Sequence, residues 1–295
     1  MAFTAKDVMK LREMTGCGMM DCKKALTEAD GDMDKATEIL REKGMAKAVK
    51  KSGRIAAEGL VDIVVEGNVG AIIEVNSETD FVAKNEEFVG MVKDFAKKVI
   101  VENPADVDAL LAATIDGATV KDILTEKIAK IGENMNLRRF ARIEGNVCTY
   151  LHAGGRIGVL VEAAEALDTE EKYEAARDVA MQVAAINPLY LSKDTVPAED
   201  VEKEKHIIMA QIKEDPKNAS KPDAIIEKMV GGKINKFYEQ NCLLQQEFVK
   251  DDSLKVEAYL ASKGVKLINF VRLEKGEGIE KKQENFADEV ASMIK

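Results

Sequence analysis

The chain of 295 residues has no tryptophan, only two histidines and an aromatic content of 5%. His152 and His206 are the only imidazoles, so any histidine-based catalytic triad would have to use one of them. Neither is accompanied by a Gly-x-Ser-x-Gly motif, the turn that presents the nucleophilic serine in many hydrolases. These shortages indicate a protein that carries out no covalent catalysis.

Cysteine is scarce as well. The four cysteines are Cys17, Cys22, Cys148 and Cys242. Their scatter over a large chain is typical of reduced thiols in a cytosol. Cys17 and Cys22 have roughly the spacing of a zinc-finger pair, but two ligands without a nearby histidine do not close a zinc site. Gly16–Asp21 lacks the strand that precedes a dinucleotide-binding loop, and Gly232-Lys233 follows a helical pattern, unlike a P-loop. We therefore expect no metal and no cofactor.

Long apolar runs are missing too. The longest charge-free stretch, Val179–Ser192, is interrupted by Asn187-Pro188 and is shorter than the roughly 20 residues of a membrane-spanning helix. The first turns carry Lys6 and Asp7, unlike a secretory signal. The 53 acidic residues outnumber the 43 basic ones, for a net charge of −10, which gives no long-range attraction for phosphate backbones or anionic lipid. We expect a cytoplasmic protein with no membrane segment and no direct nucleic-acid contact.

A length of 295 residues leaves room for about two ordinary domains, and a hydrophobic content of 46% is enough to give them real cores. Residues 1–55 have the apolar pattern of a small three-helix module. The first helix is expected to end at the turn Thr15–Gly18, the second covers Met19–Ala29, and the third follows Asp30–Asp32 and ends at Gly44. The basic connector after Gly44 is either a solvated linker helix or a docking patch for an acidic partner.

From residue 56 the apolar period changes from helical to alternating. Val61, Ile63 and Val65 are expected to point inward, and Gly67-Asn68 then forms a hairpin turn from which a second strand returns. After a short link, apolar side chains recur at helical spacing over residues 88–99. This segment therefore predicts a strand–strand–helix unit.

The same pattern recurs about eighty residues later. Glu58–Val65 aligns with Glu144–Leu151, and Gly70–Glu74 aligns with Gly158–Glu162. The helix of each copy stops at an Asn-Pro pair, and a further helical stretch around 120–131 lies between the copies. The repeat predicts an α+β fold with a duplicated core, in which helices pack on antiparallel sheets.

Four of the five prolines cluster after the second copy and bracket two helices. Each helix has a single apolar stripe, and Asp215–Ser220 joins them, which predicts an antiparallel helical hairpin. The stripes contain Val201, Ile208 and Ile212 in the first helix, and Ile226, Met229, Val230 and Phe237 in the second. Such a hairpin is a natural arm for self-association or for binding a partner.

The last part of the chain is expected to rejoin the core. A short helix with Val256, Tyr259 and Leu260 precedes a strand at Leu267–Leu273. Beyond a glycine-rich link lies an amphipathic helix, whose apolar stripe must be covered by its own core or by a partner protein. Its apolar residues are Phe286, Val290 and Met293.

Several long segments resemble, in order along the chain, the signature motifs of the bacterial elongation factor Ts family. These segments are Leu11–Leu26, Thr79–Asn85, Lys130–Asn134 with Arg138-Arg139, Phe270–Glu274 and Gly276–Glu280. They span nearly the whole chain. The sequence departs from the family's pattern at Leu243–Val249, where the family often has Gly-Gln-Pro.

The resemblance implies an architecture that agrees with the patterns above. Its parts are a ubiquitin-associated-like helical domain with linker at 1–55, a core N-subdomain at 56–140, a core C-subdomain at 141–198 and 241–275, an inserted coiled-coil hairpin at 199–240, and a C-terminal module at 276–295.

The resemblance also implies a guanine-nucleotide exchange factor that binds elongation factor Tu with GDP and promotes GDP release and GTP loading. A nucleotide complex with a nanomolar Kd corresponds to about 12 kcal/mol, part of which the factor must offset through contacts that compete with the nucleotide or its Mg²⁺. Binding linkage makes this effect reciprocal, so incoming nucleotide releases the factor. Such a function requires no nucleophile, in keeping with the missing catalytic motifs.

Residue type alone would make Phe81 a core residue and Asp80 a helix-capping carboxylate. The family motif instead implies that Phe81 wedges into the GTPase and disturbs the elements that hold Mg²⁺, with Asp80 adding a polar contact. Thr79 and Val82 would supply shape and support. Further implied contacts with the partner are Met19, Met20, Lys23, Ile131, Gly132 and His152.

Simpler roles stay open for several of these positions. Two methionines cannot both face so small a core, which favours a binding surface for Met19 and Met20. Ile131 could equally be buried, and His152 could be a solvent-exposed turn residue. The rivals to an exchange factor are an adaptor that only tethers partners and an RNA-binding translation protein, which the acidic charge opposes. Residues 199–240 are a candidate homodimer interface.

Overall fold

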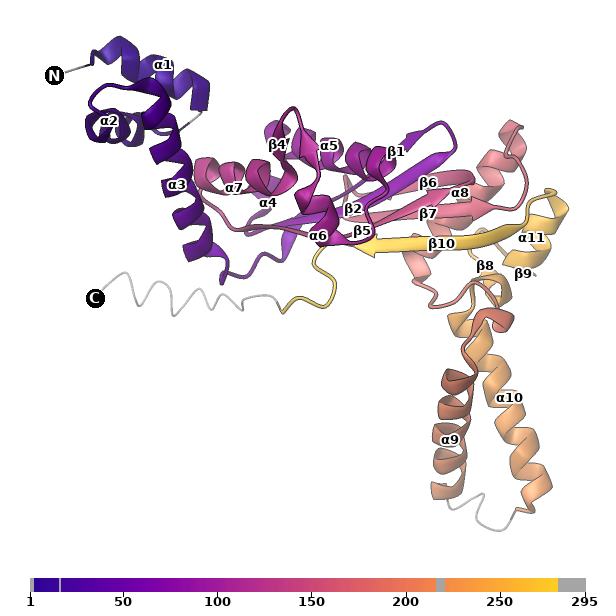
Figure 1. Cartoon of the computed structure of the whole chain (residues 1–295). Coiled ribbons are helices and arrows are strands. Elements are labelled where there is room, and N and C mark those ends of the chain that lie inside the picture. The colour runs from indigo at the N-terminus through magenta and orange to yellow at the C-terminus, as the bar shows by residue number, and fades with distance from the viewer. Residues whose placement is uncertain (1–2, 16, 216–220, 281–295) are drawn as a thin grey trace. The chain divides into compact units, whose positions relative to one another are not determined.

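The computed structural model describes residues 3–15, 17–215 and 221–280 (Figure 1). It contains helices and antiparallel sheets, which confirms the α+β class. The chain forms two compact units. Unit 1 comprises Met1–Val64, Ala71–Arg142 and Leu273–Lys295, and unit 2 comprises Val65–Gly70 and Ile143–Arg272.

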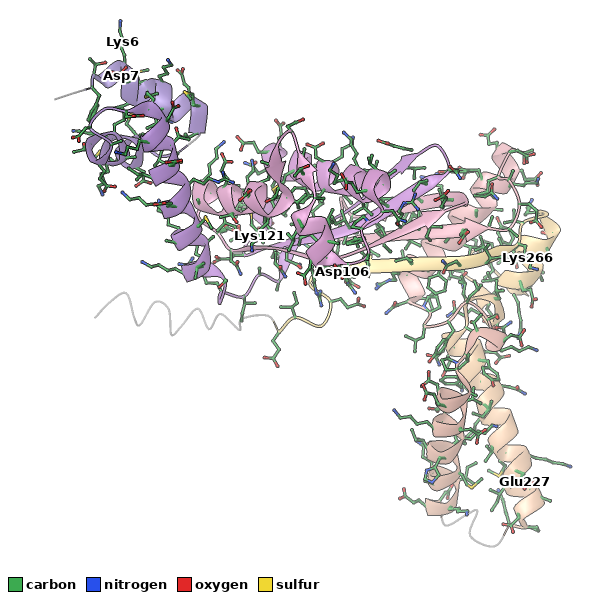
Figure 2. All side chains as sticks on the ribbon, in the orientation of Figure 1. Lys6, Asp7, Asp106, Lys121, Glu227 and Lys266 are labelled. Atoms are coloured by element: carbon green, nitrogen blue, oxygen red, sulfur yellow. The ribbon has the colours of Figure 1, made fainter. Side chains whose placement is uncertain are left out.

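Three helices open unit 1: α1 (Ala5–Thr15), α2 (Met19–Glu28) and α3 (Met33–Lys51). Thr4 caps α1, because its hydroxyl oxygen accepts a hydrogen bond from the Asp7 backbone N–H at 3.4 Å. In return, the Asp7 carboxylate accepts hydrogen bonds from the backbone N–H and the hydroxyl of Thr4, both at 2.7 Å (Asp7 is labelled in Figure 2). The helices close over a small core made of Val8, Leu11, Cys22, Ala25, Leu26, Ala29, Ala36 and Leu40. Three helices are therefore present where the apolar pattern predicted them. Gly16, in the predicted turn, lies outside the described residues.

The predicted end of the third helix at Gly44 is wrong, because α3 continues to Lys51. A Cβ at Gly44 would lie 3.3 Å from the Cβ of Ala129 in α7 (Val120–Ile131). Glycine at this position allows two helices to approach closely and does not terminate α3. The basic connector is consequently the last part of this helix.

The first sheet has the strand order β1-β2-β5, with β1 (Glu58–Glu66), β2 (Val69–Ser77) and β5 (Met135–Glu144). The strands β1 and β2 flank Gly67-Asn68, as the turn signal predicted. The expected alternation is not clean, because Val65 is 43% exposed whereas Val64 is buried. The central strand β2 is buried almost throughout, so it shows no alternation.

Helix α5 (Glu86–Glu102) packs its predicted apolar face inward, with Phe88, Val92, Phe95 and Val99 all fully buried. It ends at Asn103, which has a left-handed φ of +46° just before Pro104. Helix α7 has the predicted bounds. The sequence patterns did not reveal the short elements in this unit, which are α4 (Asp80–Ala83), α6 (Val107–Ala112), β3 (Thr114–Ile115) and β4 (Ala118–Thr119).

Unit 2 repeats the strand–strand–helix order of β1, β2 and α5 and, like unit 1, adds a later third strand to its sheet. Its sheet runs β10-β7-β6, with β6 (Asn146–His152), β7 (Ile157–Ala163) and β10 (Leu267–Glu274), and β6 pairs antiparallel with β7. In each sheet, a hairpin is joined by a later strand that lies beside its second member. Helix α8 (Glu170–Ile186) has 17 residues, as α5 has, and ends at Asn187 with φ +52°. The predicted repeat therefore corresponds to two sheets of like topology.

The predicted helical hairpin consists of α9 (Ala198–Glu214) and α10 (Asp223–Asn241). It has its own hydrophobic cluster, made of Ile208, Ile212, Ile226, Val230 and Ile234. Phe237, which the stripe placed inward, is only half-buried. Residues 216–220 of the predicted joint lie outside the described residues.

The base of the hairpin is bonded to unit 2 through backbone and amide groups. The backbone N–H groups of Leu189 and Tyr190 both donate to the carbonyl of Asn241, at 2.9 and 3.1 Å. Buried Gln246 accepts a hydrogen bond from Gln182 of α8 at 3.1 Å. The segment Leu243–Val249, which departs from the family's pattern, begins with the 3₁₀ turn η2 (Leu243–Gln245).

The remaining elements of unit 2 are β8 (Glu247–Phe248), β9 (Asp251–Lys255) and α11 (Val256–Ser262). Val256 and Leu260 are buried, as predicted, and β10 rejoins the sheet beside β7. The predicted terminal helix with Phe286, Val290 and Met293 lies outside the described residues. None of the helices in the described part of the chain is long and apolar enough to cross a membrane.

Candidate interaction site

The loop that follows β2 is held by a carboxylate from the loop that follows α7. Thr79 caps α4, and its hydroxyl accepts a hydrogen bond from the Val82 backbone at 3.5 Å. The same hydroxyl donates to Glu133 Oε1 at 2.7 Å, and the Thr79 backbone N–H donates to Glu133 Oε2 at 3.0 Å. Two hydrogen bonds to one carboxylate fix the start of α4.

A second set of bonds fixes the loop that follows α7. Gly132 ends this helix with φ +90°, and its carbonyl accepts a hydrogen bond from Lys51 of α3. The backbone N–H of Asn134 donates to Glu78 at 2.6 Å, and its side-chain amide donates to the Arg54 carbonyl at 2.7 Å. The loops at 78–82 and 131–134 are therefore neighbours, although they are far apart in the sequence.

Phe81 is the most exposed large apolar residue in the described part of the chain, at 81% of its surface. Its neighbours Val82 and Ala83 are only 7% and 8% exposed, so the short helix α4 is anchored by these two side chains and presents Phe81 to solvent. The core position that residue type alone would assign to Phe81 is wrong. A fixed, exposed aromatic ring is a typical anchor for a protein partner.

Two ionised carboxylates lie near Phe81 in the sequence. Asp80 lies 2.5 Å from the ammonium of Lys84, and this hydrogen bond, together with the charges of Lys84 and Lys275, lowers the pKa of Asp80. Hydrogen bonds from Lys130 and Lys127 lower the pKa of Glu87, in the first turn of α5, to about 2. Both carboxylates are therefore ionised at neutral pH.

The N-terminal candidates lie on the outward side of α2. Met19 and Met20 are 41% and 61% exposed, and Lys23 is exposed beside them. The opposite side of α2 carries Cys22 and Leu26, which are buried. The side chains of Met19, Met20 and Lys23 are thus available to a partner, on an element other than the two loops.

His152 belongs to unit 2, at the end of β6. Its Nδ1 lies 3.0 Å from the Tyr150 hydroxyl, and the imidazole is exposed. The structure therefore brings Thr79–Val82 together with Ile131 and Gly132, whereas His152 lies in the other unit.

The residues that hold the two loops were not predicted from the sequence. Glu133 and Asn134 belong to a family motif, but no individual role was predicted for them, and none was predicted for Glu78 or Lys51. The available signal was their position, because Glu78 directly precedes Thr79 and Glu133 directly follows Gly132.

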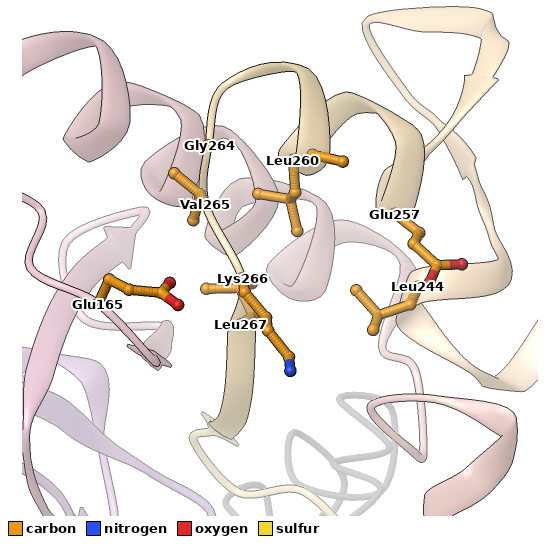
Figure 3. A pocket seen from close by; sticks show the side chains of 9 residues that line it. Glu165, Leu244, Glu257, Leu260, Gly264, Val265, Lys266 and Leu267 are labelled. Carbon is orange, nitrogen blue, oxygen red and sulfur yellow. The ribbon is translucent and has the colours of Figure 1, made fainter.

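A cavity of about 420 Å³ in unit 2 is a competing location (Figure 3). Leu244, Leu260 and Leu267 form part of its lining, and its charged side chains are Glu165, Glu257 and Lys266. None of the predicted site residues lines it. Within the described ranges, no group of three His, Cys, Asp or Glu side chains could hold a metal ion.

The chain matches the model of the family described as "Elongation factor TS" over residues 78–277. The match begins directly before Thr79 and includes Ile131, Gly132 and His152. It does not extend to Met19, Met20 and Lys23. The loops at 78–82 and 131–134 both lie inside it.

Proposed function

The chain belongs to the elongation factor Ts family, and from this premise we propose that it binds elongation factor Tu carrying GDP, disturbs the Mg²⁺ and nucleotide site of that GTPase, and promotes GDP release and GTP loading. Members of the family are nucleotide exchange factors for elongation factor Tu in translation elongation. No step of this function requires covalent chemistry by the factor itself.

The observation that carries the proposal is the exposure of Phe81 on a loop that is held in place by the neighbouring loop at 131–134. Because the Thr79–Glu133 and Asn134–Glu78 bonds already order the loop, binding costs little further conformational entropy there. Burying the ring in a partner yields about 1.5–3 kcal/mol. That free energy is available to offset part of the affinity for nucleotide.

The neighbouring residues receive distinct roles in this proposal. Asp80, which is ionised, makes a polar contact that displaces groups on the magnesium side of the partner's site. Thr79 and Val82 support Phe81: Thr79 caps α4, and the buried side chain of Val82 anchors it. Ile131 and Gly132 extend the contact surface.

More distant contacts are assigned to Met19, Met20, Lys23 and His152, all of which are exposed. Helices α1–α3 are proposed to form a ubiquitin-associated-like module, and α9–α10 an inserted coiled coil. Residues 199–240 are the candidate homodimer interface. We further propose a cytoplasmic location, with no direct contact to nucleic acid or membrane.

Stopped-flow release of fluorescently labelled GDP from elongation factor Tu tests the function. The chain is expected to accelerate release, and Phe81→Ala to reduce the acceleration by roughly 10- to 150-fold, which corresponds to the 1.5–3 kcal/mol of lost burial. Because Phe81 is exposed, the variant's free energy of unfolding should stay within about 0.5 kcal/mol of the parent. Val101→Ala, at an apolar position in α5 that is 71% exposed, is the matched control.

The outcomes separate the rival functions. An adaptor would bind elongation factor Tu without changing the rate of GDP release. An RNA-binding protein would retain RNA at physiological salt and leave the GTPase unaffected. Full exchange activity in Phe81→Ala would refute the wedge even if the parent chain accelerates release.

A further inference from the structure

A fully buried carboxylate lies on the strand that leads into the interaction site. Glu74 of β2 has no exposed surface. It accepts hydrogen bonds from Arg139 Nε at 2.6 Å, Arg138 Nη1 at 3.1 Å, Asn76 Nδ2 at 3.0 Å and the backbone N–H of Gly276 at 2.8 Å. Burial raises the pKa of Glu74, but the hydrogen bonds outweigh this effect and hold the pKa below its usual value. The carboxylate is therefore ionised and fully engaged.

Both arginines also hold the segment that follows β10, which we call the C-terminal strap (residues 274–279). Arg139 Nη2 donates to the Glu274 carbonyl at 3.1 Å and pairs with the Glu277 carboxylate at 3.0 Å. Arg138 Nη2 donates to the Glu277 carbonyl. The buried Glu74 carboxylate thus positions the guanidinium groups of Arg138 and Arg139, and these groups bind the backbone of the strap.

The strap itself has little apolar anchoring. Within it, only Gly276 is buried, and a Cβ at this position would lie 2.1 Å from the Ala57 carbonyl oxygen. Ile279 is half-buried, and the other strap side chains are charged or absent. Because apolar burial contributes so little here, the attachment of the strap depends on the charges beneath it.

The strap is bonded to both strands of the β1–β2 hairpin, and the second of these strands leads into the interaction site. Lys275 forms an ion pair with Glu58 at 2.6 Å, and its positive charge also acts on Asp80. The Asn76 amide donates both to the Glu74 carboxylate and to the Glu58 carbonyl, so it connects β2 to the backbone of the residue that pairs with Lys275. Five positions after Glu74, the chain enters the cap of α4 at Thr79.

We propose that Glu74 is a positioning residue for nucleotide exchange. Through Arg138 and Arg139, it holds the C-terminal strap in place, so that Lys275 stays paired with Glu58 and the strap adds to the surface that the partner contacts. This inference rests on the proposed exchange function. Glu74 itself touches neither the partner nor the nucleotide.

The position of the strap can be measured without any partner. Since the chain has no tryptophan, Ile279→Trp introduces a single reporter. In this background, Glu74→Gln is expected to increase acrylamide quenching of the tryptophan by about twofold or more, because the strap is released by local unfolding. Glu66→Gln removes the same charge from an exposed position at the end of β1 and should leave quenching unchanged.

The second measurement is the dependence of GDP release on factor concentration. Glu74→Gln is expected to raise the half-saturating concentration by about fivefold or more, the usual scale of coupling between sites, and to leave the maximal rate close to that of the parent. A loss of correctly folded protein would instead lower the active fraction in proportion, which a titration of active sites detects. Circular dichroism confirms that the variant is folded at the assay temperature.

Arg139→Lys keeps the test decisive if Glu74→Gln does not fold. A lysine retains the charge, but it cannot contact Glu74, the Glu274 carbonyl and Glu277 at once. It should shift quenching and the half-saturating concentration in the same direction as Glu74→Gln.

Two results would overturn the proposal: unchanged quenching in a folded variant, or a released strap with an unchanged half-saturating concentration. If the parent chain itself fails to accelerate GDP release, the proposed function falls, while the quenching result still decides whether Glu74 holds the strap.

Discussion

Single residues in this protein derive their properties from what lies around them more than from their type. Phe81 and Phe95 both lie in helices, yet Phe81 is 81% exposed and Phe95 is fully buried. Phe95 lies on the inner stripe of a long amphipathic helix, whereas Phe81 is in the first turn of the four-residue helix α4. In so short a helix, burial of Val82 satisfies the anchoring requirement and leaves Phe81 in solvent.

The thiols show the same dependence on surroundings. Burial raises the pKa of Cys148 and of Cys242 to about 11 each, and it raises the pKa of Cys22 as well. At pH 8, a thiol with a pKa near 11 is ionised to only about one part in a thousand, and the thiolate is the reactive form. Cys17 is only half-buried.

We therefore predict that a disulfide reagent such as dithionitrobenzoate modifies one thiol rapidly in the native protein at pH 8, and that this thiol is Cys17. The other three should react at the rate of unfolding, or at once in denaturant. Cys17→Ser should abolish the fast phase. A fast phase that persists in Cys17→Ser would show that one of the buried thiols is accessible.

At the scale of elements, the hairpin α9–α10 is the part least dependent on its surroundings. Its hydrophobic cluster is separate from the core of unit 2, in which α8 packs against the β6–β7 hairpin. The hairpin connects to that core through backbone bonds from Leu189 and Tyr190 to Asn241, through the Gln246 amide, which donates to the Gln240 carbonyl, and through the Tyr190 hydroxyl, which donates to Asp200. An element built in this way can be removed without opening the core beneath it.

Replacing residues 199–240 with a short Gly-Ser linker should therefore leave unit 2 folded, with its free energy of unfolding changed by no more than about 1–2 kcal/mol. Circular dichroism and chemical denaturation measure this change. If residues 199–240 form the homodimer interface, sedimentation will show the full chain as a dimer and the shortened chain as a monomer. Equal sedimentation behaviour per protomer in both forms would exclude the hairpin as the interface.

At the scale of the whole molecule, the division into two units predicts how the chain responds to damage in either core. Ile72 of β2 belongs to unit 1 and Leu160 of β7 to unit 2, and both are fully buried. Each unit has a helix of equal length, α5 or α8, against which local opening can be compared.

Ile72→Ala and Leu160→Ala should each cost roughly 2–5 kcal/mol, the usual penalty for truncating a large buried aliphatic side chain. Because stability is not uniform across a chain, the loss should fall mainly on the unit that carries the substitution. Amide hydrogen exchange is expected to accelerate in α8 more than in α5 for Leu160→Ala, and the reverse for Ile72→Ala. Equal acceleration in both helices would show that the chain unfolds as one cooperative body.

Local sequence patterns predicted the order of the main elements, both hairpin strands in each copy and the bounds of α7. It was also sufficient for the ends of α5 and α8, where an asparagine in the left-handed region precedes proline. Helical and alternating apolar periods, caps and turn residues all act over a few neighbouring positions, so they can be read directly. The helix end predicted at Gly44 was wrong because this glycine allows a close approach to Ala129, a residue that is distant in the sequence.

The tertiary structure alone decided which residues meet at the interaction site. Thr79 and Glu133 are 54 positions apart, and Glu74 and Gly276 are 202 positions apart. Neither pairing leaves a local periodic signal, because hydrogen bonds and ion pairs depend on where the folded chain brings the groups together. The family motifs named the loop that carries Phe81, and only the fold showed its exposure, the carboxylate that holds it and the bonds between Glu74 and the strap.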